Sequence, residues 1–164
     1  MSLSSSLKPA RTLLGTVAED SVRCGHSVEN VPRSEAGLKC LAADGNWSAV
    51  AQLAEQLRAA TSDSTPDGLS KKLQYALAQV TANFYMRRYG AARKVMECLG
   101  DLNDDRYRDP VTKESLVPFS LRFVVAILPL YCGSKKDSQN LLYDLLEECK
   151  KCAGVSPPPL WMDR

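Results

Sequence analysis

The feature that most constrains the fold is a long run of apolar residues at helical spacing in the middle of the chain. Thr65 followed by Pro66 offers a helix start, because the N–H that proline lacks would be unpaired in the first helical turn anyway. Steps of three and four residues then place one apolar stripe along about four turns, formed by Leu69, Leu73, Ala76, Leu77, Val80 and Phe84. This stripe predicts an amphipathic helix that needs a partner surface.

The same pattern returns along the chain, which indicates a repeat. Three blocks each combine a turn with a second helix: GNWSAVAQLAEQL, RRYGAARKVMECL and GSKKDSQNLLYDLLEEC. Trp47, Tyr89 and Lys135 hold matching positions, at spacings above the roughly 34 residues of a regular tetratricopeptide repeat. In the second block, the expected turn glycine is replaced by Arg87 or displaced to Gly90. We predict an all-α fold of antiparallel helical hairpins, stacked as a degenerate tetratricopeptide-like α-solenoid.

Cap and turn signals set the limits of the first and third hairpins. Ser34 can cap the first helix, which the turn Asp44-Gly45-Asn46 ends. The third pair opens at Val117-Pro118, and its first helix is apolar on nearly every side, so we expect it to lie buried between neighbours. Gly133 ends that helix, and Ser134 with Asp137 forms a variant of the capping box. The linker before this pair, GDLNDDRYRDPVTKES, predicts a surface loop.

These limits divide the chain into three parts. Residues 33–152 are the helical-repeat domain of about three hairpins. Residues 1–32 are expected to be a disordered leader; their serines and basic residues resemble a transit peptide, but Glu19 and Asp20 argue against one. Residues 153–164 form a proline-rich tail, because the prolines of VSPPPLWMDR cannot continue the last helix.

Charge and hydropathy argue against two classes of partner. The chain carries 21 basic and 19 acidic side chains, a net charge of +2, so it has no strong field of one sign to gather nucleic acid or an anionic membrane. The most apolar run, FVVAILPLYC, is about half the length that spans a bilayer. We therefore expect no nucleic-acid partner and at most peripheral membrane association.

Sequence motifs for catalysis or metal binding are absent. The chain has no glycine-rich phosphate loop, no Gly-x-Ser-x-Gly elbow and no His-Glu-x-x-His, and its one histidine, His26, lies in the expected leader. Cys149 and Cys152 form a CxxC, but a zinc site needs further ligands and a thioredoxin-like site needs a strand before the pair. The acidic linker lacks EF-hand spacing. The prediction is a protein without enzymatic activity, cofactor or metal, with reduced thiols.

Three segments together resemble the trafficking protein particle (TRAPP) complex subunit 12 family, in its tetratricopeptide-repeat region. The most specific segment is KESLVPFSLR, followed by the Gly133-Ser134 turn and the helix DSQNLLYDLLEECKK. LKCLAADGNWSAVAQLAEQL is similar to the first hairpin of that family, and CLGDLNDDRY resembles the acidic, tyrosine-bearing loop before VPFS. The resemblance covers roughly residues 34–151.

The resemblance implies a scaffold subunit of a vesicle-tethering complex in transport between endoplasmic reticulum and Golgi. It implies other TRAPP subunits as partners and a cytoplasmic location, peripheral on Golgi and ER–Golgi intermediate membranes. Nucleotide exchange on Rab GTPases belongs to the small core subunits of that complex, so no enzymatic activity is implied here. Candidate interaction residues come from the loop and the VPFSLR motif: Tyr107, Arg108, Val117, Pro118, Phe119 and Arg122.

One departure from the family and one alternative remain open. Family members continue into further repeats, whereas this chain stops at Arg164, so the third hairpin is expected to leave a face uncovered. The alternative is an independent adaptor that binds a peptide in the groove of its hairpins, as co-chaperone tetratricopeptide domains do. The Lys and Asn pair that clamps a terminal carboxylate in those domains is not evident here. A third, enzymatic hypothesis rests on the CxxC alone.

Overall fold

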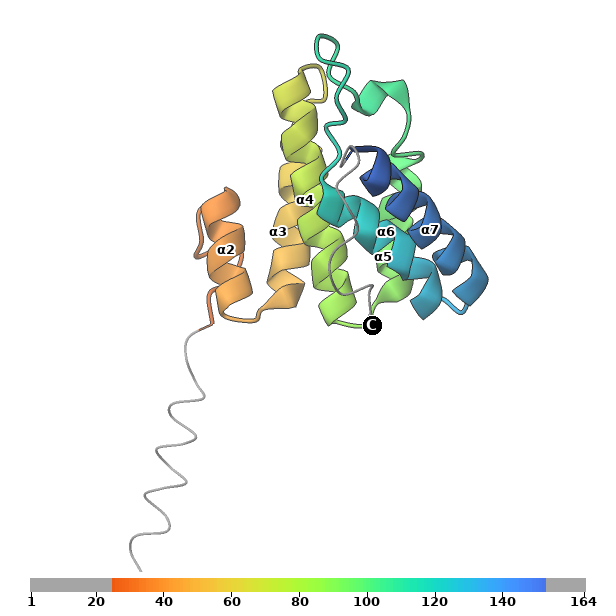
Figure 1. Cartoon of the computed structure of the whole chain (residues 1–164). Helices are drawn as coiled ribbons and strands as arrows, with labels where there is room; N and C mark the ends of the chain where they lie inside the picture. The colour runs from red at the N-terminus through yellow and green to blue at the C-terminus, as the bar shows by residue number, and fades with distance from the viewer. Residues whose placement is uncertain (1–24, 153–164) are drawn as a thin grey trace, which may run out of the picture.

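The computed structural model describes residues 25–152, and six α-helices make up most of this part (Figure 1). They are α2 Glu35–Ala43, α3 Trp47–Ala60, α4 Pro66–Tyr85, α5 Tyr89–Leu99, α6 Phe119–Tyr131 and α7 Lys135–Cys152. A short 3-10 helix, η1 Asp105–Tyr107, interrupts the long connection between α5 and α6. The described residues contain no β-strand, only an isolated bridge between Arg108 and Ser115, so the predicted all-α class is confirmed.

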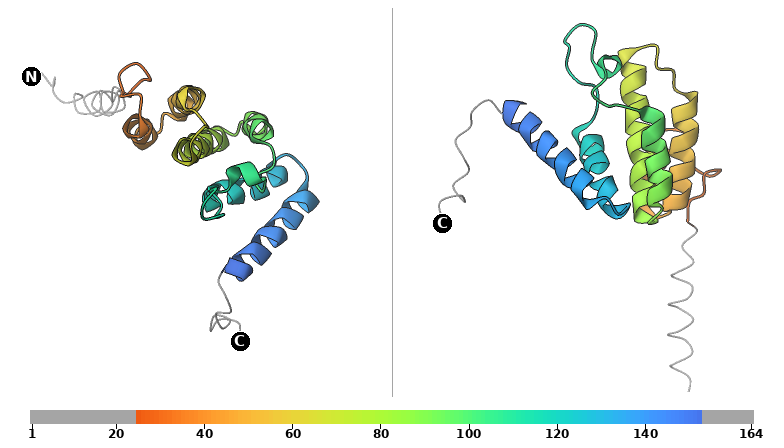
Figure 2. Two further views of the ribbon diagram at one scale, coloured as in Figure 1. Left: turned by 90° about the horizontal axis from the view of Figure 1, so that it is seen from above. Right: turned by 90° about the vertical axis from the view of Figure 1, so that its right-hand side faces the viewer.

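Consecutive helices pack as adjacent antiparallel pairs: α2 with α3, α4 with α5, and α6 with α7 (Figure 1). Seen from above, the chain alternates between two layers, with α2, α4 and α6 on one side and α3 and α5 on the other (Figure 2). α4 packs against α3, α5 and α6, whereas α2 and α7 each have one principal neighbour, α3 and α6 respectively. The two end helices are therefore the least covered.

The three hairpin turns share one backbone arrangement. Gly45, Arg87 and Gly133 have positive φ angles of 72°, 56° and 92°. The next residue of each turn donates its backbone N–H to a carbonyl oxygen in the last turn of the preceding helix: Asn46 to Leu41 at 3.0 Å, Arg88 to Asn83 at 2.8 Å and Ser134 to Pro129 at 2.8 Å. This is the Schellman arrangement that closes helix C-termini. Arg87 therefore takes the place of the turn glycine in the second hairpin, and Gly90 lies inside α5.

α4 separates two apolar clusters. Its predicted stripe faces α5 and α6, and Leu73, Ala76 and Val80 are fully buried there. A second face of α4, which includes Tyr75 and Ala82, packs with residues of α2 and α3. The predicted start of the helix is confirmed, because the Thr65 side chain accepts a hydrogen bond from the N–H of Gly68 at 3.1 Å. α4 is thus the central element of the fold.

α6 is not buried between neighbours, so that expectation was wrong. Leu121 and Leu128 are buried in the cluster with α4 and α5, and Val124, Val125 and Ile127 are half-buried. Four large apolar residues of the helix are nevertheless between 45% and 57% exposed: Phe119, Phe123, Leu130 and Tyr131. α6 contacts α4 and α5 on one side and α7 on another, and among the described residues the face with Phe119, Phe123 and Leu130 stays exposed. Even so, no helix within residues 25–152 is long and apolar enough to cross a membrane.

Residues 1–24 and 153–164 lie outside the described residues, and with them most of the expected leader and all of the expected tail. The described end of the leader segment, residues 25–32, packs against the first hairpin. Val31 is buried in the cluster of α2 and α3, and the Nδ1 of His26 lies 2.5 Å from a carboxylate oxygen of Asp44. Asn46 also donates its Nδ2–H to the His26 carbonyl at 3.0 Å.

Candidate functional site

Exposed apolar side chains concentrate on the third hairpin. Of the large apolar residues that are exposed in the described part, all but Tyr85 and Val111 belong to α6 or α7. Tyr131 is partly covered, because its ring stacks on that of Tyr89 with centroids 4.9 Å apart. The remaining six, which we call the α6–α7 apolar surface, are Phe119, Phe123, Leu130, Leu141, Tyr143 and Leu146. The three on α6 share one face, whereas Leu141 and Tyr143 lie on opposite sides of α7 because they are two residues apart.

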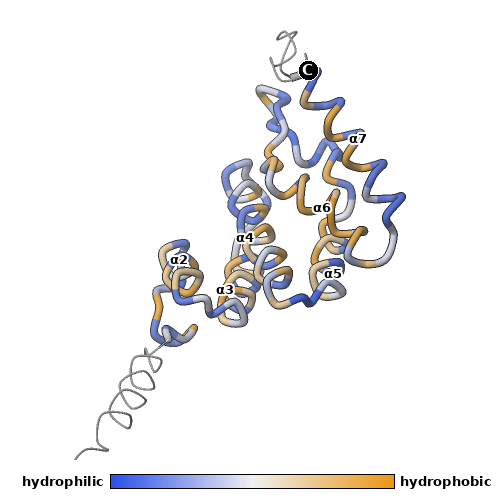
Figure 3. The backbone as a smooth tube through the Cα atoms, turned by 60° about the horizontal axis from the view of Figure 1, so that its bottom comes forward, coloured by the Kyte–Doolittle hydropathy of each residue, from blue (hydrophilic) through white to orange (hydrophobic). Residues whose placement is uncertain are grey.

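The geometry of the third hairpin explains why this surface stays open. Phe119, Phe123 and Leu130 recur at steps of a helical face, so all three lie on the same side of α6. Among the described side chains of α7, Ser138 is the one that is buried, and its hydroxyl donates a hydrogen bond to the Ala126 carbonyl at 2.7 Å. Figure 3 shows the contrast between the two helices: α6 is hydrophobic along most of its length, whereas hydrophobic and hydrophilic residues alternate along α7.

Arg122 joins the linker to both helices of this hairpin. Its Nη1 lies 2.5 Å from the Oε2 of Glu148 on α7, and its Nη2 donates a hydrogen bond to the Ser115 hydroxyl at 2.8 Å. The guanidinium of Arg122 is therefore occupied within the chain. Arg122 positions α7 against α6 rather than presenting a free charge to a partner.

The structure divides the other predicted interaction residues of the VPFSLR motif and the loop between core and surface. Tyr107 and Val117 are buried in the cluster around α4. The Tyr107 hydroxyl donates a hydrogen bond to the Leu99 carbonyl at 2.6 Å, and burial raises the pKa of the Tyr107 phenol. Pro118 is half-buried, whereas Phe119 is exposed and belongs to the α6–α7 apolar surface.

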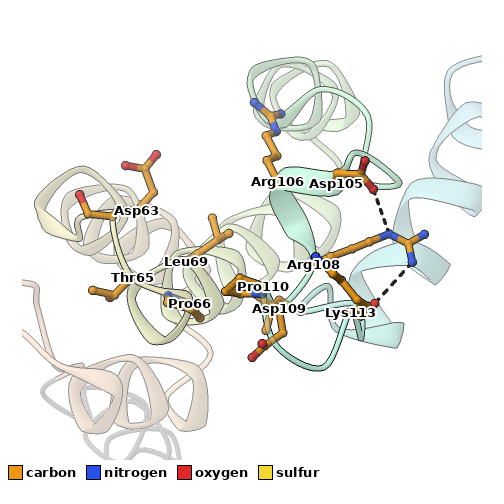
Figure 4. A pocket seen from close by; sticks show the side chains of 12 residues that line it. Asp63, Thr65, Pro66, Leu69, Asp105, Arg106, Arg108, Asp109, Pro110 and Lys113 are labelled. Atoms are coloured by element: carbon orange, nitrogen blue, oxygen red, sulfur yellow. Dashed lines mark hydrogen bonds and ion pairs between the residues drawn. The ribbon is translucent and has the colours of Figure 1, made fainter.

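Arg108 lines an open cleft of about 560 Å³ between the start of α4 and the linker loop (Figure 4). Its side chain turns toward Asp105, with Nε and Oδ1 3.5 Å apart, and toward the Lys113 carbonyl at 3.5 Å. Acidic and basic residues are equal in number around the cleft: Asp63, Asp105 and Asp109 face Arg106, Arg108 and Lys113. Because these charges balance, the cleft has no clear preference for an anion or a cation.

Several residues of the α6–α7 apolar surface were not predicted as site residues, namely Phe123, Leu130, Leu141, Tyr143 and Leu146. The signal that could have found them is the apolar character of α6 on nearly every side, since a helix of that kind needs more cover than one partner helix provides. From periodicity alone we interpreted that signal as burial within the chain, although the departure from the TRAPP family pattern led us to expect an uncovered face on the third hairpin. The structure shows that part of the cover is missing from residues 25–152.

The CxxC acquires no further ligands from the described part of the chain. Cys40, Cys98, Cys132 and Cys149 are free thiols, and Cys149 is half-buried on α7. Nothing is described of Cys24 or of the Cys152 side chain. Within residues 25–152, no three side chains of the metal-binding types His, Cys, Asp and Glu come together.

Comparisons with known proteins reveal no relative of this chain. No family model matches it, no curated protein matches it, and no solved structure matches it. The resemblance to the TRAPP subunit 12 family therefore remains a prediction from the motifs quoted above.

Proposed function

We propose that this protein is a non-catalytic scaffold that binds other proteins through its helical hairpins. The observation that carries the proposal is the α6–α7 apolar surface, six exposed apolar side chains on one hairpin, of which Phe119, Phe123 and Leu130 are gathered on one face of α6. Isolated apolar residues are normal on a protein surface, whereas gathered ones mark sites of association. Burying a large apolar side chain contributes on the order of 1.5–3 kcal/mol, so a protein partner that covers this surface gains substantial binding energy.

The tetratricopeptide-like α-solenoid is part of this proposal. Its support is the recurrence of one Schellman turn in all three hairpins and the alternation of the helices between two layers (Figure 2). In such arrays each repeat covers the apolar face of its neighbour, and an end repeat that is meant to face water carries a polar outer face. The third hairpin instead exposes Phe119, Phe123 and Leu130 along one face of α6, as expected of a repeat that packs against a further polypeptide.

We further propose a place in a TRAPP-type tethering complex that acts between endoplasmic reticulum and Golgi, in the cytoplasm and peripheral to those membranes. The support for this part is the resemblance in KESLVPFSLR, CLGDLNDDRY and the first hairpin. Two residues of the VPFSLR motif have positions in the third hairpin that are consistent with a binding function. Phe119 is on the α6–α7 apolar surface, and Arg122 holds α7 against α6.

Affinity isolation from cells that express the tagged full chain tests both parts of the proposal. We compare the wild type with Phe123→Asp, which places a charge in the surface, and with Val111→Asp, which makes the same kind of change at a residue that is 86% exposed in the loop. TRAPP subunits identified by mass spectrometry should accompany the wild type and Val111→Asp, but not Phe123→Asp. Circular dichroism of both variants serves as the control for folding, and their helical signal should match that of the wild type.

Two outcomes contradict different parts of the proposal. If the wild type recovers no TRAPP subunit, the assignment to a tethering complex is wrong. If Phe123→Asp recovers the same subunits in the same amounts, the α6–α7 apolar surface is not the binding site.

A further inference from the structure

A groove with polar walls opens between α3 and α5, with α4 as its floor. The first stretch of the groove has a volume of about 480 Å³. Viewed from above, α3 and α5 flank α4 on the same side of the array (Figure 2). Ala51 on the α3 wall and Ala91 on the α5 wall are small, and this leaves room above the floor residues Gln79 and Asn83.

A second hollow extends this groove toward the start of α4. Its volume is about 320 Å³, and it shares Arg58 and Cys98 with the first stretch. Together the two hollows, which we call the α4 groove, run along α4 from Asn83 to Leu69. At the rise of an α-helix this length is about 20 Å, which accommodates about six residues of extended chain.

The floor of the α4 groove contains a buried polar atom without a partner. Gln79 is 7% exposed. Among the buried side-chain nitrogen and oxygen atoms of residues 25–152, its Oε1 is the one without a hydrogen-bond partner. One turn further on, the buried Asn83 donates its Nδ2–H to the Gln79 backbone carbonyl at 2.9 Å. An unpaired buried oxygen destabilises a fold, so its presence needs an explanation. The oxygen itself has almost no accessible surface, so the carboxamide has to rotate toward the groove before an N–H donor of a ligand can satisfy it. A peptide backbone carries such donors at regular intervals.

The walls of the α4 groove are mainly basic. Around the first stretch, the cations of Arg58, Arg88 and Lys94 outnumber the single carboxylate of Glu55. The second hollow adds Lys72 and Arg106, of which Lys72 is paired with Asp63 at 3.0 Å. The excess positive charge favours an acidic ligand. The first stretch is lined by no aromatic residue, and Tyr107, which lines the second hollow, is only 4% exposed, so the described residues that line the groove offer no open ring on which a nucleic-acid base could stack. This favours a peptide over a single-stranded nucleic acid.

We propose that the α4 groove binds an extended acidic peptide segment of a partner protein. The Gln79 carboxamide oxygen accepts a backbone N–H of the peptide, and Arg58, Arg88 and Lys94 pair with its carboxylates. This site is separate from the α6–α7 apolar surface and does not depend on membership of a tethering complex.

Nuclear magnetic resonance of the ¹⁵N-labelled full chain tests the site directly. The probe is a pool of blocked heptapeptides with glutamate at alternate positions and Ala, Ser or Val between them; the matched pool has lysine in place of glutamate. The glutamate pool should shift the side-chain amide signals of Gln79 and Asn83 and the backbone signals of both walls, and added salt should weaken the binding. An equal response to the lysine pool, no response of the groove, or tighter binding of oligouridine would overturn the proposal.

Two variants separate binding from folding. Lys94→Glu should weaken binding of the glutamate pool roughly tenfold, a loss of about 1.4 kcal/mol, whereas Lys136→Glu on α7 makes the same charge change outside the groove and should leave binding unchanged. Gln79→Leu should weaken binding of the glutamate pool. It should also raise the urea midpoint of unfolding, because it removes the unpaired buried oxygen. Unchanged peptide affinity in Gln79→Leu would overturn the role of the carboxamide.

Discussion

At the scale of single residues, the hairpin turns show how a repeat persists when its sequence signal has degenerated. At positive φ, the Cβ atom of a side chain lies too close to the backbone, which costs roughly 1–2 kcal/mol. Glycine has no Cβ and avoids this cost. Gly45 and Gly133 avoid this cost, and Arg87 adopts the same conformation at a φ of 56°. The turn survives in the second hairpin because its hydrogen bonds and the packing of α4 against α5 outweigh one unfavourable residue.

Arg87→Gly should therefore stabilise the protein, by about 1 kcal/mol in the free energy of unfolding. The matched control is Arg93→Gly, the same substitution inside α5, which should destabilise it by about 1 kcal/mol because glycine is a poor helix former. Urea unfolding followed by circular dichroism gives both values. A loss of stability in Arg87→Gly would contradict this prediction. It would mean that contacts of the arginine side chain stabilise the fold by more than the backbone strain at positive φ destabilises it.

Tyr107 leads to a prediction with a defined dependence on pH. Tyr107→Phe removes the hydrogen bond to Leu99 and should lower the free energy of unfolding by about 1 kcal/mol at neutral pH. Burial raises the pKa of the folded phenol above its ordinary value of about 10, so the unfolded chain releases this proton first as the pH rises. The advantage of the wild type over Tyr107→Phe should therefore be complete below pH 10 and shrink above it. Urea titrations of both proteins at about pH 7 and 11 measure this difference, and a constant difference would contradict it.

At the scale of the elements, local signals were predictable from the sequence and neighbour relations were not. The start of α4 and the turns at Gly45 and Gly133 follow from caps and glycines that act within a few residues. The second packing face of α4 was missed, because alanines such as Ala82 carry little hydrophobic signal and become core only when α3 lies against them. The periodicity of α6 predicted burial, whereas the departure from the TRAPP family pattern predicted an uncovered face on the third hairpin, and the exposure of α6 agrees with the second expectation. Burial depends on which elements are present to cover a face, and periodicity does not contain that information.

The candidate sites divide in the same way. Phe119 was predicted and is exposed, but Tyr107 and Val117, which were predicted with it, are core residues. Val117 and Phe119 belong to one contiguous motif and Tyr107 to the loop before it, but residues close in sequence point in different directions once a chain folds. Gln79 and Asn83 were not predicted as site residues; two carboxamides one helical turn apart on a largely apolar face are the sequence signal that could have indicated the α4 groove.

A pair of leucine substitutions tests the asymmetry of α6. Leu121→Ala should lower the free energy of unfolding by about 2–5 kcal/mol, because Leu121 is fully buried and its removal leaves a cavity. Leu130→Ala removes the same atoms from an exposed position and should cost less than about 1 kcal/mol. Urea unfolding of the two variants in parallel checks the difference. Similar losses for both would show that the outer face of α6 is covered in solution.

At the scale of the whole molecule, stability should be graded along the array. In stacked hairpins each helix is held mainly by its immediate neighbours, so cooperativity falls toward the ends. α4 packs against three helices and contributes to both apolar clusters. α7 packs mainly against α6, and Ser138 is its one buried residue among the side chains described. A partner on the α6–α7 apolar surface would give this end of the array the second neighbour that the inner helices already have.

Hydrogen exchange measures this gradient directly. Amides of α4 should exchange most slowly and those of α7 fastest, because α7 can open without disturbing either apolar cluster. Ser138→Ala removes the hydrogen bond to the Ala126 carbonyl, worth about 1 kcal/mol, and should speed exchange in α7 about fivefold while α4 stays unchanged. If α4 and α7 accelerate together, the described helices open as one cooperative unit, and the third hairpin is not an independently mobile end awaiting a partner.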